Sequence, residues 1–556
     1  MTIAATPKTS RSLGAFEPLR ERTFRAIWSS SLLSNFGSLV LGVGAAWEMT
    51  RLTNSPGMVA LIQTALMLPI MIVAVPAGAI ADMFDRRKVA LAGLAFAFVC
   101  AAALAVIASL GYTSPWLLLG FCTLISSGGA LYSPAWQASV REQVKAEHLP
   151  AAVALASVSY NIARSFGPAL GGVIVLLAGA RSAFGINAIC YLPLIVAFFL
   201  WRRPDTPSRL PPERIDRAIV AGARYAVHSP PIRTVIVRSL GTGMAGASVS
   251  ALTPIVARDL LYGGAGTYGL LLGMFGGGAV AGALLIPRIR KAMKSENAMR
   301  LCALITGGSI VIVGLSHDVI LTAVVMAVAG TAWMLMAAIL NLGVQLSAPR
   351  WVTARALSWY QSSLTGGIAI GAWLWGRVAT DHGVGAAMIA SGAAMILTPL
   401  IGLLMPMPRM LASAIEQIGI AHEPEVALAL TARSGPVVVE IDYDVDPDQA
   451  RQFYDVMRKL QRARKRNGAF EWSIARDIAD PALWTERYSC PTWGDYLRQR
   501  SRFTLSDLAL QKLADGFCRP DGIRRIRRRL ERPFGSVRWR ADSPDPQSEP
   551  IPIFAP

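Results

Sequence analysis

Long apolar stretches separated by short polar loops fill the chain from residue 24 to residue 405. A helix needs about 20 apolar residues to cross the ~30 Å hydrocarbon core of a bilayer. Twelve such stretches lie in two groups of six, on either side of a polar connector at 202–233. The pattern predicts membrane-spanning helices at 24–50, 57–81, 89–110, 114–137, 149–178, 183–201, 234–257, 266–287, 301–316, 318–346, 356–378 and 384–405.

Basic residues fall mainly on one side of this predicted bundle. If the N-terminus is inside, the inner loops hold most of the loop arginines and lysines. The outer loops hold little beyond Arg51, Arg181, Arg258 and Arg377. This asymmetry follows the positive-inside rule. The formal net charge of +19 therefore indicates membrane topology rather than nucleic-acid binding, and both termini are expected on the cytoplasmic side of the inner (cytoplasmic) membrane.

Composition supports a membrane protein with a soluble part at its end. Only 16% of the residues are charged, against about a quarter in soluble domains. Residues 1–23 contain no short apolar core with a cleavage site, so no signal peptide is expected. The expected parts are a cytoplasmic tail at 1–23, helical halves at 24–201 and 234–405, a connector at 202–233 with an amphipathic helix at 213–228, a linker at 406–435, a soluble domain at 436–542 and a flexible tail at 543–556.

The two halves repeat each other at a constant spacing of 204 residues. Short motifs recur in this register, as in Asn35-Phe-Gly-Ser and Ser239-Leu-Gly-Thr. Three glycine pairs share the same spacing, namely Gly78 with Gly282, Gly167 with Gly371, and Gly172 with Gly376. One shared register indicates a duplicated six-helix unit, and two such halves related by an axis along the membrane normal are a transporter architecture.

The loop after the second stretch carries a recognisable signature. It reads Gly78-Ala-Ile-Ala-Asp82-Met-Phe-Asp85-Arg86-Arg87-Lys88. This resembles the loop 2–3 signature of the major facilitator superfamily, although Met83 and Asp85 replace the usual basic residue and glycine. The resemblance implies a conformational latch made of Gly78, Asp82, Asp85, Arg86 and Arg87.

In that latch, Asp82 and Arg86 would hold the cytoplasmic side closed against the start of the eleventh span near Arg355. An acidic group at a helix end can face the positive N-terminus of another helix. The alternative is that Asp85 to Lys88 form only a solvated loop that sets topology.

The fifth stretch contains a second motif, with Asn161, Arg164, Gly167, Pro168, Gly171 and Gly172. Gly-Pro-x-x-Gly-Gly resembles the antiporter motif of drug exporters in the same superfamily, with Ala163 where a glycine is usual. Small residues let helices approach closely, and proline removes a backbone hydrogen bond and bends the helix. The resemblance implies export.

Two charged residues within the apolar stretches are candidate functional groups. Arg164 lies near the middle of its stretch, where a charge is costly and usually faces a cavity or a partner. It is either a substrate or coupling residue, or a structural arginine bonded to backbone carbonyls. Glu48 could carry a coupling proton if burial raised its pKa, or it pairs with Arg51 at the interface. Other candidate cavity groups are Asn35, Gln63, Asn161 and Gln361.

Several classes of chemistry find no support in the sequence. It has no G-x4-G-K-[ST] run for ATP, so the energy is expected to come from a gradient, and the superfamily resemblance implies a proton gradient. The six cysteines form no CxxC pair and the five histidines are dispersed. We therefore expect no metal, no cofactor and no catalytic constellation.

The soluble part shows alternating patterns after residue 436. Residues 437–445 predict a half-buried strand, and Asp446-Pro447 begins a helix. Further strands are expected near 470–474 and 484–490, helices from about 493 and 504, and a last strand at Val537 and Trp539. This β-α-β-β-α-β order predicts a ferredoxin-like fold. The basic run Arg524 to Arg529 is expected either to contact anionic lipid or to form a solvated helix face.

This tail resembles the extension of one branch of the superfamily, the transmembrane secretion effectors related to the enterobactin exporter. The likeness rests on the twelve spans and on Thr492-Trp493-Gly-Asp495-Tyr496-Leu497-Arg498-Gln499. The extension is similar to antibiotic-biosynthesis monooxygenase-like domains, which implies possible dimerisation. A shared fold does not transfer chemistry.

These patterns predict an α-helical membrane protein with a C-terminal α+β domain. The expected function is proton-coupled export of small amphiphilic molecules, such as a siderophore, drug or metabolite, by alternating access. The central arginine and the scarcity of acidic groups within the spans favour anionic or neutral cargo. Two alternatives remain: a membrane-tethered enzyme or ligand sensor that acts through the tail, and an uptake transporter.

Overall fold

The computed structural model describes residues 16–145, 148–202, 223–349, 352–407, 426–519 and 525–531. The chain divides into two compact units. The first contains the helical bundle, from residues 1–219, 234–342 and 358–407. The second contains the C-terminal domain together with two short segments, from residues 220–233, 343–357 and 408–556.

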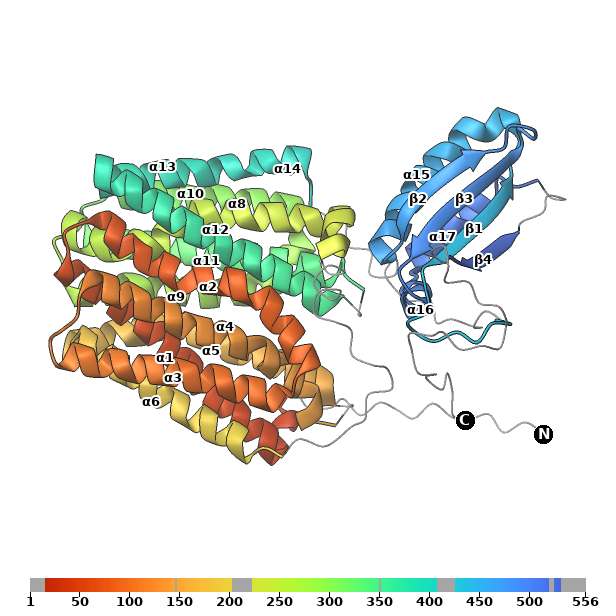
Figure 1. Ribbon diagram of the computed structural model, residues 1–556. Helices are drawn as coiled ribbons and strands as arrows, with labels where there is room; N and C mark the ends of the chain where they lie inside the picture. The colour runs from red at the N-terminus through yellow and green to blue at the C-terminus, as the bar shows by residue number, and fades with distance from the viewer. Residues whose placement is uncertain are drawn as a thin grey trace, which may run out of the picture. The chain divides into compact units, whose positions relative to one another are not determined.

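Six helices form the first half of the bundle within the described residues, and they run side by side in Figure 1. Prolines stand in the first turn of α2 and α4, where the missing amide costs nothing. Gly179, with φ of +81°, separates the last two helices. The helices are α1 (Arg22–Leu52), α2 (Pro56–Met83), α3 (Arg86–Ser109), α4 (Pro115–Gln143), α5 (Leu149–Ala178) and α6 (Ala180–Leu200).

The second half repeats this arrangement. The described helices are α8 (Pro230–Ile255) with a π-helical turn (Val256–Leu260), α9 (Ala265–Ala292), α10 (Ser295–Leu315), α11 (Val319–Gln345), α12 (Thr353–His382), α13 (Val384–Leu397) and α14 (Ile401–Leu404). A 3-10 turn at Thr398–Leu400, which contains Pro399, separates α13 from α14. The stretch expected at 384–405 is therefore one membrane-length helical segment, Val384–Leu404, with a 3-10 turn inside it.

Among the described residues, ten helical segments are long and apolar enough to cross a membrane. The two remaining long helices are α5 and α12. In α5 the apolar segment is 166–178, which is shorter than a full span. Helix α12 carries charged residues such as Arg377 and Asp381 near its end. Both occupy positions at which the sequence predicts a span.

Glycines bring helices into direct contact inside each half. A Cβ atom at Gly93 of α3 would lie 2.8 Å from the carbonyl oxygen of Gly128 in α4. Gly307 of α10 and Gly392 of α13 approach each other in the same manner, at 2.7 Å. Such small-residue contacts replace the hydrophobic effect as the source of helix association in lipid.

The C-terminal domain has the predicted ferredoxin-like topology. Its elements are β1 (Val437–Asp444), α15 (Ala450–Asn467), β2 (Phe470–Arg476), β3 (Leu483–Cys490), α16 (Trp493–Ser501), α17 (Leu505–Asp515) and β4 (Ile526–Leu530). The strands pair antiparallel in the order β2-β3-β1-β4. Alternate residues of β1, including Ile441 and Tyr443, pack with Phe453 and Leu460 of α15 in one buried core.

The basic run near the end of the chain is a strand, which corrects the expectation of a helix face. Arg527 and Arg529 lie on β4, paired with β1. Arg527 Nη2 lies 2.9 Å from Asp442, and Arg529 Nη2 lies 3.2 Å from Glu440. These cross-strand ion pairs stabilise an arginine-rich strand at the edge of the sheet. The strand expected at 537–539 lies outside the described residues, as does most of the helix expected at 213–228, of which 223–228 is helical.

Candidate functional site: contacts between the two helical halves

The end of the bundle where α1 finishes and α2 begins, here called the α1–α2 end, joins the two halves through glycines. A Cβ atom at Gly172 of α5 would overlap the Cα of Gly269 of α9. A Cβ atom at Gly376 of α12 would lie 2.6 Å from Ala60 Cβ and 3.3 Å from the Cα of Gly57, both in α2. Gly172 and Gly376 are the pair that the 204-residue repeat relates. Each half therefore uses the same glycine to contact the other.

Polar and aromatic contacts join the halves at the same end. Arg258, in the turn after α8, donates from Nη1 to the carbonyl oxygen of Thr50 at 3.0 Å. Asp259 holds the same guanidinium at 2.5 and 3.1 Å. Trp47 of α1 stacks on Tyr268 of α9 with ring centroids 5.8 Å apart. An arginine on the last carbonyls of α1 also suits the negative end of that helix.

Glu48 belongs to an ion-pair group at this end. Its carboxylate is buried, and it lies 3.3 Å from Arg51 Nη1 and 3.5 Å from Arg181 Nε. Both arginine side chains are about half exposed. Glu48 is thus paired with Arg51 and also with Arg181 of α6, and its position at the membrane interface stays a prediction. A role in proton coupling stays a prediction.

The expected latch residues fasten α3 to its neighbours in the first half. Arg86 Nη1 lies 2.7 Å from Glu142 Oε1 at the end of α4. Arg87 donates to the carbonyl oxygens of Phe198 and Phe199 at 3.0 and 2.5 Å, so it caps the end of α6. These contacts give the basic loop a structural role besides topology.

The three other latch residues lie in α2 and directly before α3. The Asp85 side chain accepts from the backbone N–H of Arg87 and caps α3. Gly78 and Asp82 belong to α2, but the surroundings of Gly78 and the side chain of Asp82 lie outside what the structure describes. The contact of Asp82 and Arg86 with the start of α12 therefore stays a prediction.

The antiporter-like motif gives α5 two packing faces. Cβ atoms at Gly167 and Gly171 would lie 2.9 and 3.0 Å from Leu39 and Val43 of α1. Gly172 faces α9 instead, and Pro168 lies inside the helix. The motif thus places α5 between its own half and the other half. Among the predicted residues of this motif, Asn161 and Arg164 also lie on α5, with side chains outside the described residues.

The remaining polar candidates lie on three different helices. Asn35 of α1 and Gln63 of α2 are half-buried, and Gln361 of α12 is exposed. The residue after Gln63 joins the halves, because Thr64 Oγ1 donates to the carbonyl oxygen of Ala369 at 2.9 Å. These three side chains stay predicted cavity groups.

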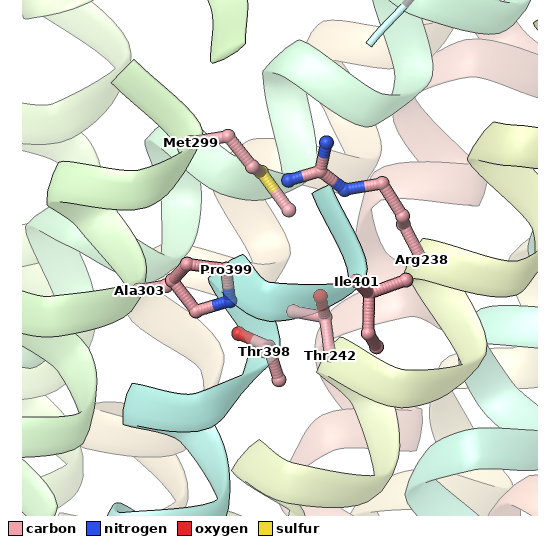
Figure 2. Close-up of a pocket in the computed structure, with 7 residues that line it drawn as sticks. All are labelled: Arg238, Thr242, Met299, Ala303, Thr398, Pro399 and Ile401. Carbon is pink, nitrogen blue, oxygen red and sulfur yellow. The ribbon is translucent and has the colours of Figure 1, made fainter. Parts of the chain in front are cut away.

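A pocket lies within the second half, between α8, α10 and α14 (Figure 2). Figure 2 shows the Arg238 guanidinium beside Met299 on one side of it, with Thr398 on the other. The space in it that a water-sized probe can occupy is about 0 Å³, whereas ligand pockets begin at ~300 Å³. Its lining comes from one half alone. We therefore do not assign it to the transport route. The lining residues are Arg238, Thr242, Met299, Ala303, Thr398, Pro399 and Ile401.

Arg238 is a buried charge that the sequence analysis did not single out. Its Nη1 lies 2.5 Å from Glu296 Oε2, and Glu296 also accepts from Arg300 Nε at 3.1 Å and from the N–H of Met407 at 2.9 Å. The sequence could have indicated it, because Arg238 is an arginine inside a predicted span, which is the criterion that selected Arg164. These contacts connect α8 and α10 to Met407, which follows α14.

Comparison with known proteins supplies a family. The sequence model of the transmembrane secretion effectors matches residues 13–534, a range that includes the C-terminal domain. The chain is 25% identical over 286 residues to the staphyloferrin A transporter of Staphylococcus aureus. This alignment covers 50% of this chain and 70% of that protein. It is 25% identical over 382 residues to the enterobactin exporter EntS of Escherichia coli, over 67% and 89% of the two chains. It is 24% identical to the multidrug efflux pump Tap of Mycolicibacterium fortuitum, in an alignment that covers 68% of this chain and 94% of that protein.

Solved structures share the fold of the helical bundle. A POT family transporter in complex with a thioalcohol-conjugated peptide aligns with a TM-score of 0.55 at 14% identity, over 69% of this chain and 96% of that chain. The nucleoside transporter NupG aligns with a TM-score of 0.56 at 11% identity, over 69% and 99%. At these identities the likeness concerns architecture alone.

Proposed function

Because the chain belongs to the transmembrane secretion effector family of major facilitator transporters, we propose that it exports small amphiphilic molecules by alternating access, driven by the proton gradient. The proposed cargo is a siderophore, a drug or a metabolite. Several relatives have names that describe exporters or efflux pumps, and this supports export over uptake. The sequence has no ATP-binding run, so a gradient is the proposed energy source.

The observation that carries the mechanism is the paired closure at the α1–α2 end. Gly172 meets Gly269, and Gly376 meets Gly57, so two equivalent contacts hold the halves together there. Rocking of two repeats about a central site is the general mode of such transporters. Backbone-to-backbone glycine contacts can separate and re-form without repacking of large side chains. They therefore suit a gate that opens and closes in each cycle.

The proposed orientation places both termini in the cytoplasm, because the basic loops then lie inside. The α1–α2 end is then the outer end. Its closure is what an exporter needs while it takes up cargo from the cytoplasm. Dimerisation through the C-terminal domain, the absence of nucleic-acid binding and the proton as coupling ion belong to the same proposal.

Everted membrane vesicles test the proposal. An untargeted comparison of metabolites in cells with and without the chain first identifies candidate cargo. We then expect vesicles that contain the chain to accumulate that cargo when acidified inside, and to lose this accumulation when a protonophore is added. Accumulation that ignores the proton gradient would exclude proton coupling. Turnover of a substrate by the chain without any transport would favour the membrane-tethered enzyme, and inward movement of cargo in cells would favour uptake.

A further inference from the structure

The end of the connector between the two helical halves is buried within the second unit. Residues 223–228 are helical, and α8 begins at Pro230. Tyr225 is only 3% exposed, and Ala226 and Ser229 are also buried. Val227 on the same turn is 61% exposed. One face of this short segment is therefore covered while the opposite face is open to solvent.

The covering surface is a corner of the C-terminal domain. Arg224 Nη1 donates to the carbonyl oxygen of Gly468 at 3.0 Å. Gly468 ends α15 with φ of +119°, the left-handed conformation that helix ends favour. The guanidinium of Arg466 lies 5.9 Å from the ring centroid of Tyr225. The connector thus supplies a donor to the end of α15 and an aromatic face to its last turn.

Asp507 fixes the shape of this corner. Its carboxylate is fully buried; it lies 2.5 Å from Arg466 Nη2 and accepts from Asn467 Nδ2 at 3.1 Å. Asp507 also forms the capping box of α17 with Thr504. The end of α15 and the start of α17 are therefore held together before they meet the connector. Burial raises the pKa of Tyr225 to about 12, against the lowering effect of Arg466, so its hydroxyl stays neutral there.

We propose that the C-terminal domain is a clasp for the connector, with residues 224–229 as the segment it binds, and that this clasp supports the transport cycle. The proposal rests on the proposed function of alternating access. The connector joins α6 to α8, and residues 220–233, which include the first turn of α8, belong to the second unit. The second unit includes 343–357 as well, where α11 ends and α12 begins.

Amide hydrogen exchange of the full-length chain in lipid nanodiscs tests the clasp directly. The test variant is the double substitution Arg224→Gln with Tyr225→Leu. The matched control is Arg233→Gln with Val227→Ala, which removes the same charge and shortens an exposed apolar side chain of the same region. We expect exchange at 223–229 and at 464–468 to rise at least tenfold in the test variant only. Exchange at 437–444 should not change, which shows that the domain stays folded.

Transport of the identified cargo in everted vesicles is measured with the same variants. We expect at least a threefold lower rate for the test variant and a wild-type rate for the control. Unchanged exchange at 223–229 would overturn the clasp itself. Faster exchange with wild-type transport would overturn its role in the cycle. If the wild-type chain moves no cargo, the proposed function fails and the role in transport fails with it, whereas the exchange result alone still decides whether the domain holds the connector.

Discussion

Arg258 reaches from the end of α8 to the carbonyl oxygen of Thr50 at the end of α1, so a side chain of one half caps a helix of the other half. Asp259 holds the guanidinium in place from the neighbouring position. The bond can exist only while the α1–α2 end is closed. It therefore adds to the stability of one conformation of the transporter and not of the other.

We expect Arg258→Gln to weaken closure of the α1–α2 end. A hydrogen bond to a charged group contributes about 1.5–3 kcal/mol, which corresponds to a tenfold or larger shift between closed and open states. Amide exchange at 49–53 should rise accordingly, and export should slow. Arg377→Gln is the matched control, because Arg377 lies near the same end and pairs with Asp381 on an exposed surface. Equal exchange in both variants would show that the Thr50 contact does not hold the end closed.

The contact between Gly172 and Gly269 leaves no room for a methyl group. A Cβ at Gly172 would meet backbone, which cannot turn aside as a side chain can. Overpacking of this kind costs about 1–3 kcal/mol, and here the cost falls on the closed state. We expect Gly172→Ala to reduce the export rate at least fivefold, which is the factor that about 1 kcal/mol corresponds to. Gly185→Ala in α6 is the control, because a Cβ there would meet nothing within 4 Å.

The 204-residue repeat makes a second, independent prediction about Gly376. If the two glycine contacts are equivalent halves of one gate, Gly376→Ala should reduce export in the same direction as Gly172→Ala. A Cβ atom added at Gly376 would lie 2.6 Å from Ala60 Cβ, so Ala60→Gly should partly restore the rate. Normal export by Gly376→Ala would mean that the two halves do not share the closure. Transport assays of the single and double variants in vesicles decide this.

The helices and the repeat could be predicted from the sequence because both depend on local pattern. The length of an apolar stretch predicts a membrane span. The repeat is visible because glycines of the two halves are 204 residues apart in the sequence. The partner of Arg258 could not be predicted, because its distance to Thr50 depends on how the halves pack. Strand β4 was misread for another reason. Arg527 and Arg529 show no apolar alternation, and only the acidic residues opposite them on β1 make a strand favourable.

Arg86 and Glu142 provide a test of the latch segment within one half. Their side chains are mostly buried and lie 2.7 Å apart, so Glu142→Gln should remove the negative charge that this buried arginine pairs with. We expect a loss of about 1–3 kcal/mol, visible as a lower unfolding temperature of the purified chain in detergent. Lys88→Gln is the control, since Lys88 is exposed in the same turn. A lower export rate with unchanged stability would instead favour the expected contact with α12.

Glu486 is the centre of a buried polar network in the C-terminal domain. Its carboxylate accepts from Arg464 at 3.1 and 3.3 Å, from Trp472 Nε1 at 2.8 Å and from the Tyr443 hydroxyl at 3.1 Å. Burial alone would lower the pKa of Arg464, but Glu486 raises it above its usual value. The guanidinium therefore stays charged in the core, and within the described residues Glu486 is the carboxylate that pairs with it.

We expect Glu486→Gln to destabilise the domain by about 3–5 kcal/mol, as breaking a buried ion pair does. Alkylation of Cys490, on the same strand as Glu486, measures this loss of domain stability. Burial raises the pKa of its thiol to about 12, so the reactive thiolate is scarce near pH 8 while the domain is folded, and alkylation requires unfolding. Alkylation of Cys490 in the full-length chain should be at least a hundredfold faster in Glu486→Gln than in Arg487→Gln, whose exposed pair with Glu531 contributes little. Equal rates in the two variants would show that the network does not hold the domain together.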